Sequence, residues 1–222
     1  MAANIEIERI KYFQGKLLAW WKDHGRHFPW REEFLSDYEL IIAEILLQRT
    51  KAETIANYYK IFLESYPSWQ SLAAARESDL AFLLKPIGLY NQRAKRISAL
   101  AKSMKQRGFI IPHDRTLLDE IPFMGQYIAN AVELLIYNQA KPLLDVNMAR
   151  VLERYFGPRQ KADIRYDPYL QSLAHEILVD VNAKEINWAI LDFAALICQS
   201  RTPKCLTCSL SINCKYYKNN KN

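Results

Sequence analysis

The chain has 222 residues, half of them apolar and 24% charged, which excludes intrinsic disorder and allows one large domain or two small ones. Six glycines and nine prolines are few for this length, which argues against turn-rich all-β folds and favours long helices. Thirty basic against twenty-four acidic residues give a net charge of +6, which suits a polyanionic partner. No apolar run approaches the ~20 residues of a membrane span, and the acidic start lacks a signal-peptide pattern, so we expect a cytoplasmic protein.

Apolar periodicity predicts helices through most of the chain. The first carries an apolar stripe from Ile10 to Trp21 and ends at Gly25, and the second is capped by Ser36 and runs through Leu47 and beyond. The further expected helices span residues 55–62, 71–75, 78–84, 92–104, 126–137, about 147–156 with Asn147 as the cap, 168–179 and 185–197. We place the domain boundary near Lys141.

A run of cations lies in the middle of the chain, between Leu80 and His113, without any acidic residue. A solvated helix face explains such a run as well as a polyanion-binding patch does. The seven cations are Lys85, Arg93, Lys95, Arg96, Lys102, Lys105 and Arg107.

All four cysteines fall within the last twenty-five residues, as Cys198, Cys205, Cys208 and Cys214. Clustered thiols in a polar tail of a cytoplasmic protein indicate metal ligation rather than disulfides. Four thiolates suit either tetrahedral zinc or an iron–sulfur cluster, and the spacing leaves both open. A zinc deaminase is excluded, because none of the four histidines makes the H-x-E motif.

A short turn at Ile121-Pro-Phe-Met-Gly-Gln-Tyr-Ile-Ala-Asn130 joins two expected helices, with Gly125 at the start of the second, where free backbone N–H groups can hold a phosphate. Together with the cysteine tail and Leu144-Asp-Val-Asn147, this turn resembles the helix-hairpin-helix DNA glycosylases of the endonuclease III superfamily. The resemblance spans nearly the whole chain and is strongest to the archaeal branch that acts on thymine mismatches. The matching segments are 44–50, 87–94, 145–151 and 192–198.

The resemblance implies an all-α, two-lobed fold. A six-helix barrel-type lobe, residues 30–140, would contain the hairpin, and residues 1–29 with 141–222 would form an iron–sulfur cluster lobe. Cys198, Cys205, Cys208 and Cys214 would then hold a 4Fe-4S cluster, with zinc as the alternative. DNA would bind across the cleft between the lobes, with the target nucleotide flipped out of the duplex.

Asp145 matches the essential aspartate of the family. A carboxylate beside the sugar stabilises the positive charge that develops as an N-glycosidic bond breaks, although an aspartate before a helix is also an ordinary cap. Glu44 matches the glutamate shared by the thymine and adenine branches. Burial would keep it protonated and able to donate to the departing base, and the alternative is a glutamate at the edge of the core.

Tyr127 stands where bifunctional members carry the lysine that forms a Schiff base. A phenol cannot form an imine, so we expect a monofunctional enzyme in which Tyr127 contacts the sugar; the alternative is a boundary residue of the core. Asn147 would support the catalytic water or Asp145, in addition to capping a helix.

The expected DNA contacts lie on three turns and on the cysteine loop. They are Gln48, Arg49, Asn91, Gln92, Arg93, Gly125, Gln126 and Lys204. One departure from the family pattern is Phe123, which replaces the first glycine of the hairpin. Either the turn is altered there, because a positive φ suits phenylalanine poorly, or Phe123 is an added DNA-contacting residue.

The expected substrate is duplex DNA with a mismatched or damaged base, most closely thymine or uracil opposite guanine. The segment 87–93 differs from the adenine branch, and the chain ends soon after Cys214 without a lesion-reading domain. The alternatives are an adenine glycosylase acting opposite 8-oxoguanine or guanine and, from another class, a non-catalytic iron–sulfur module that binds DNA or senses redox state. We expect a monomer without membrane contact, associated with the nucleoid.

Overall fold

The computed structural model describes residues 2–220, and the side chains from residue 7 onward. Within residues 2–220 every regular element is a helix, so the predicted all-α class is confirmed. No helix of this described part is both long and apolar enough to cross a bilayer. Met1, Lys221 and Asn222, which the expected cluster lobe includes, lie outside the described residues.

The chain packs into two compact units. Unit 1 comprises residues 1–26 and 139–222, and unit 2 comprises residues 27–138. Unit 2 is therefore inserted in the chain between the two parts of unit 1. These bounds fall within a few residues of the expected lobes, 30–140 and 1–29 with 141–222, which stay a prediction as functional domains.

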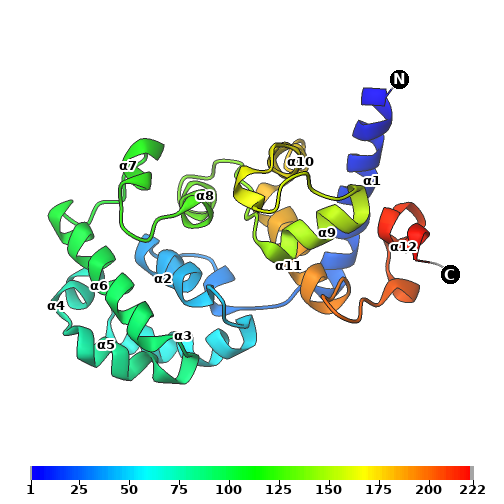
Figure 1. The fold of residues 1–222 in the computed structure, drawn as a ribbon. Coiled ribbons are helices and arrows are strands. Elements are labelled where there is room, and N and C mark those ends of the chain that lie inside the picture. Colours follow the sequence, from blue (N-terminus) through cyan, green and yellow to red (C-terminus); the bar gives the residue numbers. More distant parts are fainter. Residues whose placement is uncertain (1, 221–222) are drawn as a thin grey trace. The chain divides into compact units, whose positions relative to one another are not determined.

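Unit 2 contains seven α-helices and two short 3-10 turns within the described residues (Figure 1). The α-helices are α2 (Asp37–Leu47), α3 (Ala52–Ser65), α4 (Trp69–Ala74), α5 (Glu77–Leu84), α6 (Tyr90–Gln106), α7 (Arg115–Asp119) and α8 (Gln126–Leu135). The 3-10 turns are η1 (Pro29–Arg31) and η2 (Lys85–Ile87). Helix α6 packs against α4 and α5, and α2 packs against α3 and α8.

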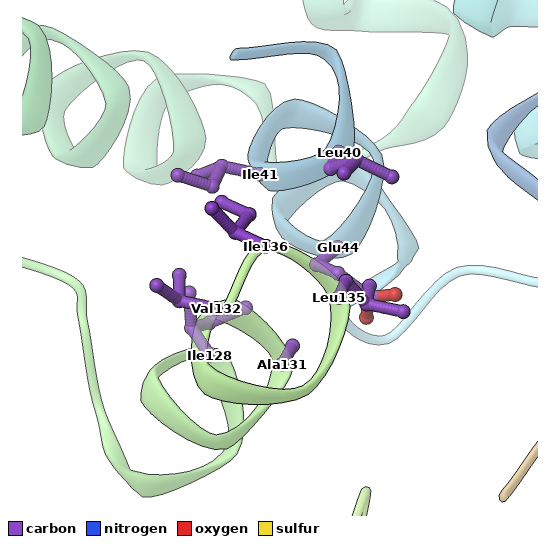
Figure 2. Close-up of a pocket in the computed structure, with 8 residues that line it drawn as sticks. All are labelled: Leu40, Ile41, Glu44, Ile128, Ala131, Val132, Leu135 and Ile136. Carbon is purple, nitrogen blue, oxygen red and sulfur yellow. The ribbon is translucent and has the colours of Figure 1, made fainter. Parts of the chain in front are cut away.

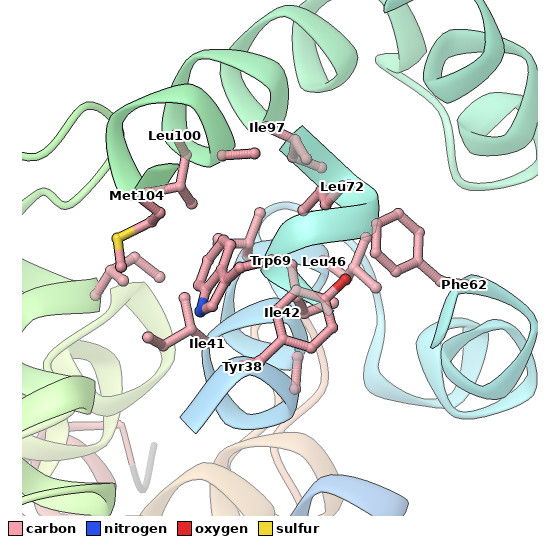
Figure 3. Close-up of a cluster of buried hydrophobic side chains, with 14 of the residues drawn as sticks. Tyr38, Ile41, Ile42, Leu46, Phe62, Trp69, Leu72, Ile97, Leu100 and Met104 are labelled. Carbon is pink, nitrogen blue, oxygen red and sulfur yellow. The ribbon is translucent and has the colours of Figure 1, made fainter. Parts of the chain in front are cut away.

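Aromatic and aliphatic side chains fill the core of unit 2, as Figure 3 shows. Tyr38 meets Trp69 edge-on, with ring centroids 5.0 Å apart, and the Tyr38 hydroxyl donates to the Tyr66 carbonyl. Phe62 is fully buried. Burying each such side chain contributes roughly 1.5–3 kcal/mol to the free energy of folding. The helices of unit 2 that carry the candidate catalytic residues therefore pack on a close-packed core.

Unit 1 is built from both ends of the chain. Its α-helices are α1 (Ala2–His24), α9 (Val146–Phe156), α10 (Pro168–Glu176), α11 (Ala183–Leu196) and α12 (Lys215–Asn219), and its 3-10 turns are η3 (Ile164–Tyr166), η4 (Cys205–Thr207) and η5 (Ser211–Asn213). Helix α11 packs against α1 and α9. The fully buried Asp192 joins α1 to α11, because it accepts hydrogen bonds from Trp21 Nε1 and from the backbone and Nε of Arg26.

The helix starts show where local sequence signals hold. Ser36 caps α2 as predicted, in a reciprocal capping box with Glu39. Helix α4 begins earlier than expected, because Ser68 caps it. The prediction that Asn147 caps α9 is wrong: Asp145 is the cap, and α9 begins at Val146.

The helix ends differ more. Helix α2 stops at Leu47 rather than beyond it, and Arg49 adopts a left-handed φ of 58° in the turn that follows. Helix α8 ends at Leu135 rather than at residue 137. The cysteine tail, which follows the last expected helix, contains η4, η5 and the short helix α12.

Candidate active site

Asp145 lies at the N-terminus of α9 in unit 1 and is partly buried. Its Oδ1 accepts hydrogen bonds from the backbone N–H groups of Asn147 and Met148, both at 2.8 Å, and its Oδ2 accepts one from Asn147 Nδ2 at 2.6 Å. Burial raises the pKa of the Asp145 carboxyl above its usual value, although these three donors and the Arg150 cation act in the opposite direction. The two backbone hydrogen bonds show that Asp145 caps α9. Its carboxylate is at the same time partly buried and poorly solvated.

A hydrogen-bonded chain runs from this carboxylate to the first cysteine. Asn147 Oδ1 accepts from Arg150 Nη1 at 3.0 Å, while Arg150 Nε donates to the Cys198 carbonyl at 2.9 Å and Nη2 donates to the Ala194 carbonyl at 3.0 Å. Asn147 thus holds Asp145 with its amide group, and Arg150 fixes which way that amide faces.

The four cysteines line a single pocket in unit 1. Arg154 closes one side of it: Nη1 donates to Cys198 Sγ at 3.4 Å and to the Gln199 carbonyl at 2.7 Å, and the guanidinium lies over the Tyr216 ring. Lys204 also lines the pocket. These cations offset the negative charge that thiolates would carry.

The four cysteines of this pocket are free thiols. Within residues 2–220, no three His, Cys, Asp or Glu side chains are arranged to hold a single metal ion. Burial raises the pKa of the Cys208 thiol to about 11, and it also raises the pKa values of Cys205 and Cys214. The donor set is nevertheless the one that thiolate-ligated metals need, four sulfurs around one space with cations beside it.

Glu44 is buried on α2 in unit 2, only 6% exposed. It lines an open depression between α2 and α8 whose other lining residues are apolar, as Figure 2 shows. Those residues are Leu40, Ile41, Ile128, Ala131, Val132, Leu135 and Ile136. The burial of Glu44 is the condition on which its proposed role as a proton donor depends, and that role stays a prediction.

The hairpin turn between α7 and α8 has a positive φ at Phe123, although phenylalanine suits that conformation poorly. Phe123 adopts a φ of 73°, the left-handed conformation that glycine would supply, and Gly125 is exposed and caps α8. The Phe123 ring packs partly against the core of unit 2, with the Arg96 guanidinium 5.3 Å from its centroid. The expectation that phenylalanine avoids the positive φ at this position is therefore wrong, and the role of Phe123 as a DNA-contacting residue stays a prediction.

Tyr127 and Gln126 occupy the first turn of α8, where both are partly buried, and Tyr127 packs against the core of unit 2. The packing agrees with the boundary role that the sequence analysis kept as an alternative. It leaves the proposed contact with the sugar a prediction.

Most of the expected DNA-contacting side chains reach solvent. Arg49, Asn91, Gln92 and Lys204 are exposed, and Gln48 is partly buried. Arg93 differs, because it is only 5% exposed and its guanidinium donates to backbone carbonyls of unit 2. We therefore remove Arg93 from the residues proposed to touch DNA.

Sequence reasoning missed Arg150 and Arg154. Both lie on α9 at positions i+3 and i+7 from Asn147, which places the three side chains on one face of the helix. That spacing, read together with the cysteines, is the signal that could have found them.

Known proteins match the chain over nearly its whole length. The family model for the HhH-GPD superfamily base excision DNA repair protein matches residues 42–187. A thymine-DNA glycosylase of Aeropyrum pernix is 38% identical over 95% of this chain and 96% of its own length. A thymine/uracil-DNA glycosylase of Methanothermobacter thermautotrophicus is 33% identical over 95% of this chain and 96% of its own length.

Solved structures give the same fold. A thermostable thymine-DNA glycosylase superposes with a TM-score of 0.88 at 32% identity, covering 99% of this chain and 100% of that one. Endonuclease III in a non-covalent DNA complex superposes with a TM-score of 0.80 at 20% identity, over 97% of this chain and 98% of that one. The human adenine DNA glycosylase is 26% identical over 95% of this chain but only 40% of its own length.

The positive φ of Phe123 makes a testable difference between two truncations. Both Phe123→Ala and Phe123→Gly lose the ring packing and the contact with Arg96, but only glycine adopts a φ of 73° without cost. We expect Phe123→Ala to be less stable than Phe123→Gly by about 1 kcal/mol in urea unfolding, since a left-handed residue with a Cβ costs ~1–2 kcal/mol. Equal stability of the two variants would contradict a strained turn.

Proposed function

The chain belongs to the HhH-GPD superfamily of base excision DNA repair proteins, and from that premise we propose that it is a monofunctional glycosylase for thymine or uracil opposite guanine in duplex DNA. The observation that carries the proposal is the half-buried Asp145 carboxylate, held by three hydrogen bonds at the start of α9. The choice of base is supported by two relatives that match over 96% of their own length, one a thymine-DNA glycosylase and the other a thymine/uracil-DNA glycosylase.

Asp145 is proposed to act on the sugar. Breaking the bond between base and sugar leaves positive charge on the deoxyribose, and a carboxylate already held in place stabilises that charge without reorganising. Its poor solvation strengthens the attraction, because less water screens it. The Asn147 amide keeps the carboxylate oriented, so Asn147 is proposed as a positioning residue.

Glu44 and Tyr127 are proposed to act on the same nucleotide. Glu44 would donate a proton to the leaving base, which neutralises the negative charge that the base gains. Tyr127 would contact the sugar, and without an amine at this position no imine with the sugar forms. The proposed enzyme therefore leaves an abasic site with an intact backbone.

Phosphate contacts are proposed for the exposed residues of three turns and the cysteine loop. The exposed residues are Arg49, Asn91, Gln92, Gly125 and Lys204, and the partly buried Gln48 and Gln126 are proposed as DNA contacts beside them. The exposed cations Lys95, Arg96 and Lys102 of α6 add to this attraction for DNA. A monomeric state and a cytoplasmic, nucleoid-associated location stay predictions.

Cys198, Cys205, Cys208 and Cys214 are proposed to hold a 4Fe-4S cluster. Four thiols that line one pocket are the donor set that such a cluster needs, and a single zinc ion with four sulfur ligands at ~2.3 Å is the alternative. Such a cluster would order the loop after α11, and hydrolysis of a glycosidic bond needs no electron from it.

A direct test incubates the protein with duplexes carrying G·T, G·U, A·8-oxoguanine or only matched pairs, followed by alkali to cut abasic sites. We expect excision of thymine and uracil, and no borohydride-trapped complex. Excision of adenine alone would move the protein to the adenine branch, and efficient trapping would overturn the monofunctional assignment.

Asp145→Asn tests the catalytic carboxylate. Asparagine caps helices as well as aspartate does, so we expect normal folding and DNA binding but a loss of excision of at least ~100-fold in single-turnover assays. Asp114→Asn is the matched control, since Asp114 Oδ1 caps α7 through the backbone N–H groups of Thr116 and Leu117. A similar loss in both variants would point to capping alone.

The raised pKa of Asp145 predicts how excision responds to acid. The reaction needs the ionised carboxylate, so the single-turnover rate should fall as the pH drops through the pKa of Asp145, at a pH above the ~3.9 of an ordinary aspartate. Circular dichroism at each pH separates this fall from unfolding. A rate that stays constant until the protein unfolds would contradict the assignment.

Metal analysis of the purified protein tests the cysteine pocket. We expect about four irons with matching acid-labile sulfide per chain and a broad visible absorbance, all lost in Cys208→Ser. One zinc per chain without sulfide is the result that would favour the alternative.

A further inference from the structure

We infer that Arg93 is a positioning residue that holds two separate turns of unit 2 together, and that DNA binding depends on it although it does not touch DNA. The inference rests on the proposed function, because the two turns carry proposed DNA contacts. One turn, residues 48–50, follows α2, and the other, residues 88–89, precedes α6.

The guanidinium of Arg93 binds both turns at once. Its Nε donates to the Gly88 carbonyl at 3.0 Å, and its Nη2 donates to the Gln48 carbonyl and to Thr50 Oγ1, both at 2.6 Å. Its Nη1 donates to the Leu46 carbonyl at 3.1 Å, with a longer contact to Ile45. These partners come from two segments, one that lies five residues before Arg93 in the sequence and one that lies 43 to 48 residues before it.

Both turns adopt conformations that need support. Arg49 has a φ of 58°, Leu89 a φ of 52° and Gly88 a φ of 73°. A left-handed non-glycine residue costs about 1–2 kcal/mol and persists only where its surroundings fix it. Arg93 bonds carbonyls directly beside these positions, so it stabilises the strained form of each turn.

The same side chain closes the end of α2. Ile45 and Leu46 belong to the last turn of that helix, where carbonyls run out of N–H donors from the helix itself. The Ile45 carbonyl also accepts a hydrogen bond from the Gln48 N–H at 3.4 Å, and a cation is favourable at this end of the helix dipole. Helix α2 also carries Glu44, so Arg93 fixes the end of the helix that presents the proposed proton donor.

Lysine cannot replace this arrangement. The five donors of arginine lie in a planar fork, so one side chain reaches Gly88 on one side and Gln48 on the other, whereas an ammonium group is a single point. The partners of Arg93 are all neutral oxygens, and burial lowers the pKa of its guanidinium. The cation is therefore committed to these carbonyls and is not available to a phosphate.

The exposed side chains next to these bonds are the ones that would face DNA. Arg49 lies between Gln48 and Thr50, the two residues to which Arg93 Nη2 donates. Asn91 and Gln92 lie in the first turn of α6, which begins at the residue after Leu89. A variant without Arg93 loses the hydrogen bonds that hold both turns. We expect the Arg49 side chain to move away from its DNA-contacting position in that variant, although Arg49 itself is unchanged.

A double-mutant cycle tests this in full-length protein with the Asp145→Asn change, so that bound DNA is not consumed. The dissociation constant for a G·T duplex is measured for Arg93→Met, Arg49→Ala and their combination. We expect Arg93→Met to weaken binding about tenfold, and the combination to be little weaker than the larger single effect, because a displaced Arg49 has already lost its contact. Arg93→Lys should resemble Arg93→Met.

Thr50→Val is the milder variant, in case Arg93→Met fails to fold. It removes one hydrogen bond from Arg93 and keeps the shape of the side chain, and we expect a weakening of about threefold that is also not additive with Arg49→Ala. Arg26→Met is the matched control: it removes an arginine that binds the buried Asp192 in unit 1, and its effect should multiply with that of Arg49→Ala.

The outcomes separate this inference from the proposed function. If Arg49→Ala weakens binding but its effect multiplies with those of Arg93→Met and Thr50→Val, Arg93 has only a general structural role and the inference is wrong. Wild-type affinity in Arg93→Lys would also overturn it. If the unmodified protein neither binds nor excises at mismatches, the proposed function itself fails.

Discussion

The hydrogen bonds accepted by one carboxylate organise the part of unit 1 on which the proposed chemistry depends. Asp145 starts α9 through two backbone donors and receives the Asn147 amide on its second oxygen. An ionised carboxylate has about four acceptor positions, so these bonds occupy most of its capacity and fix its orientation. The same Asn147 is held by Arg150, which also binds the carbonyl of Cys198. The side chains of Arg150 and Asn147 therefore connect the carbonyl of Cys198 to the Asp145 carboxylate by hydrogen bonds.

A single charged side chain satisfies backbone groups at a helix end in each unit, Arg93 in unit 2 and Asp145 in unit 1. Arg93 satisfies carbonyls at the end of α2 and in two strained turns, while Asp145 satisfies N–H groups at the start of α9. In each case one buried or partly buried charge makes several directed hydrogen bonds, which offset the cost of removing that charge from water. Exposed residues beside these charges, such as Arg49 and Asn91, are then presented in fixed positions.

The helical class, most helices and the cysteine cluster could be predicted from the sequence, because periodicity, capping residues and spacing are local signals. Ser36 shows this: Ser-x-x-Glu predicts the cap that α2 has. Local signals fail where two good caps stand two residues apart, so Asn147 was preferred to Asp145. They also fail for Arg93, whose place in a run of cations indicates exposure, whereas its burial depends on carbonyls distant in sequence. For Phe123 the sequence left two alternatives, and only the backbone showed that the turn is kept at the expense of strain.

The insertion of unit 2 between the two parts of unit 1 has a consequence for biosynthesis. All of unit 2, residues 27–138, leaves the ribosome before the first residue of the second part of unit 1. Helix α1, which bears the apolar stripe Phe13 and Leu17, must therefore wait for α9 and α11 before its partners exist. Until then the nascent chain exposes the apolar side chains of α1, and transiently exposed apolar surface of this kind favours aggregation.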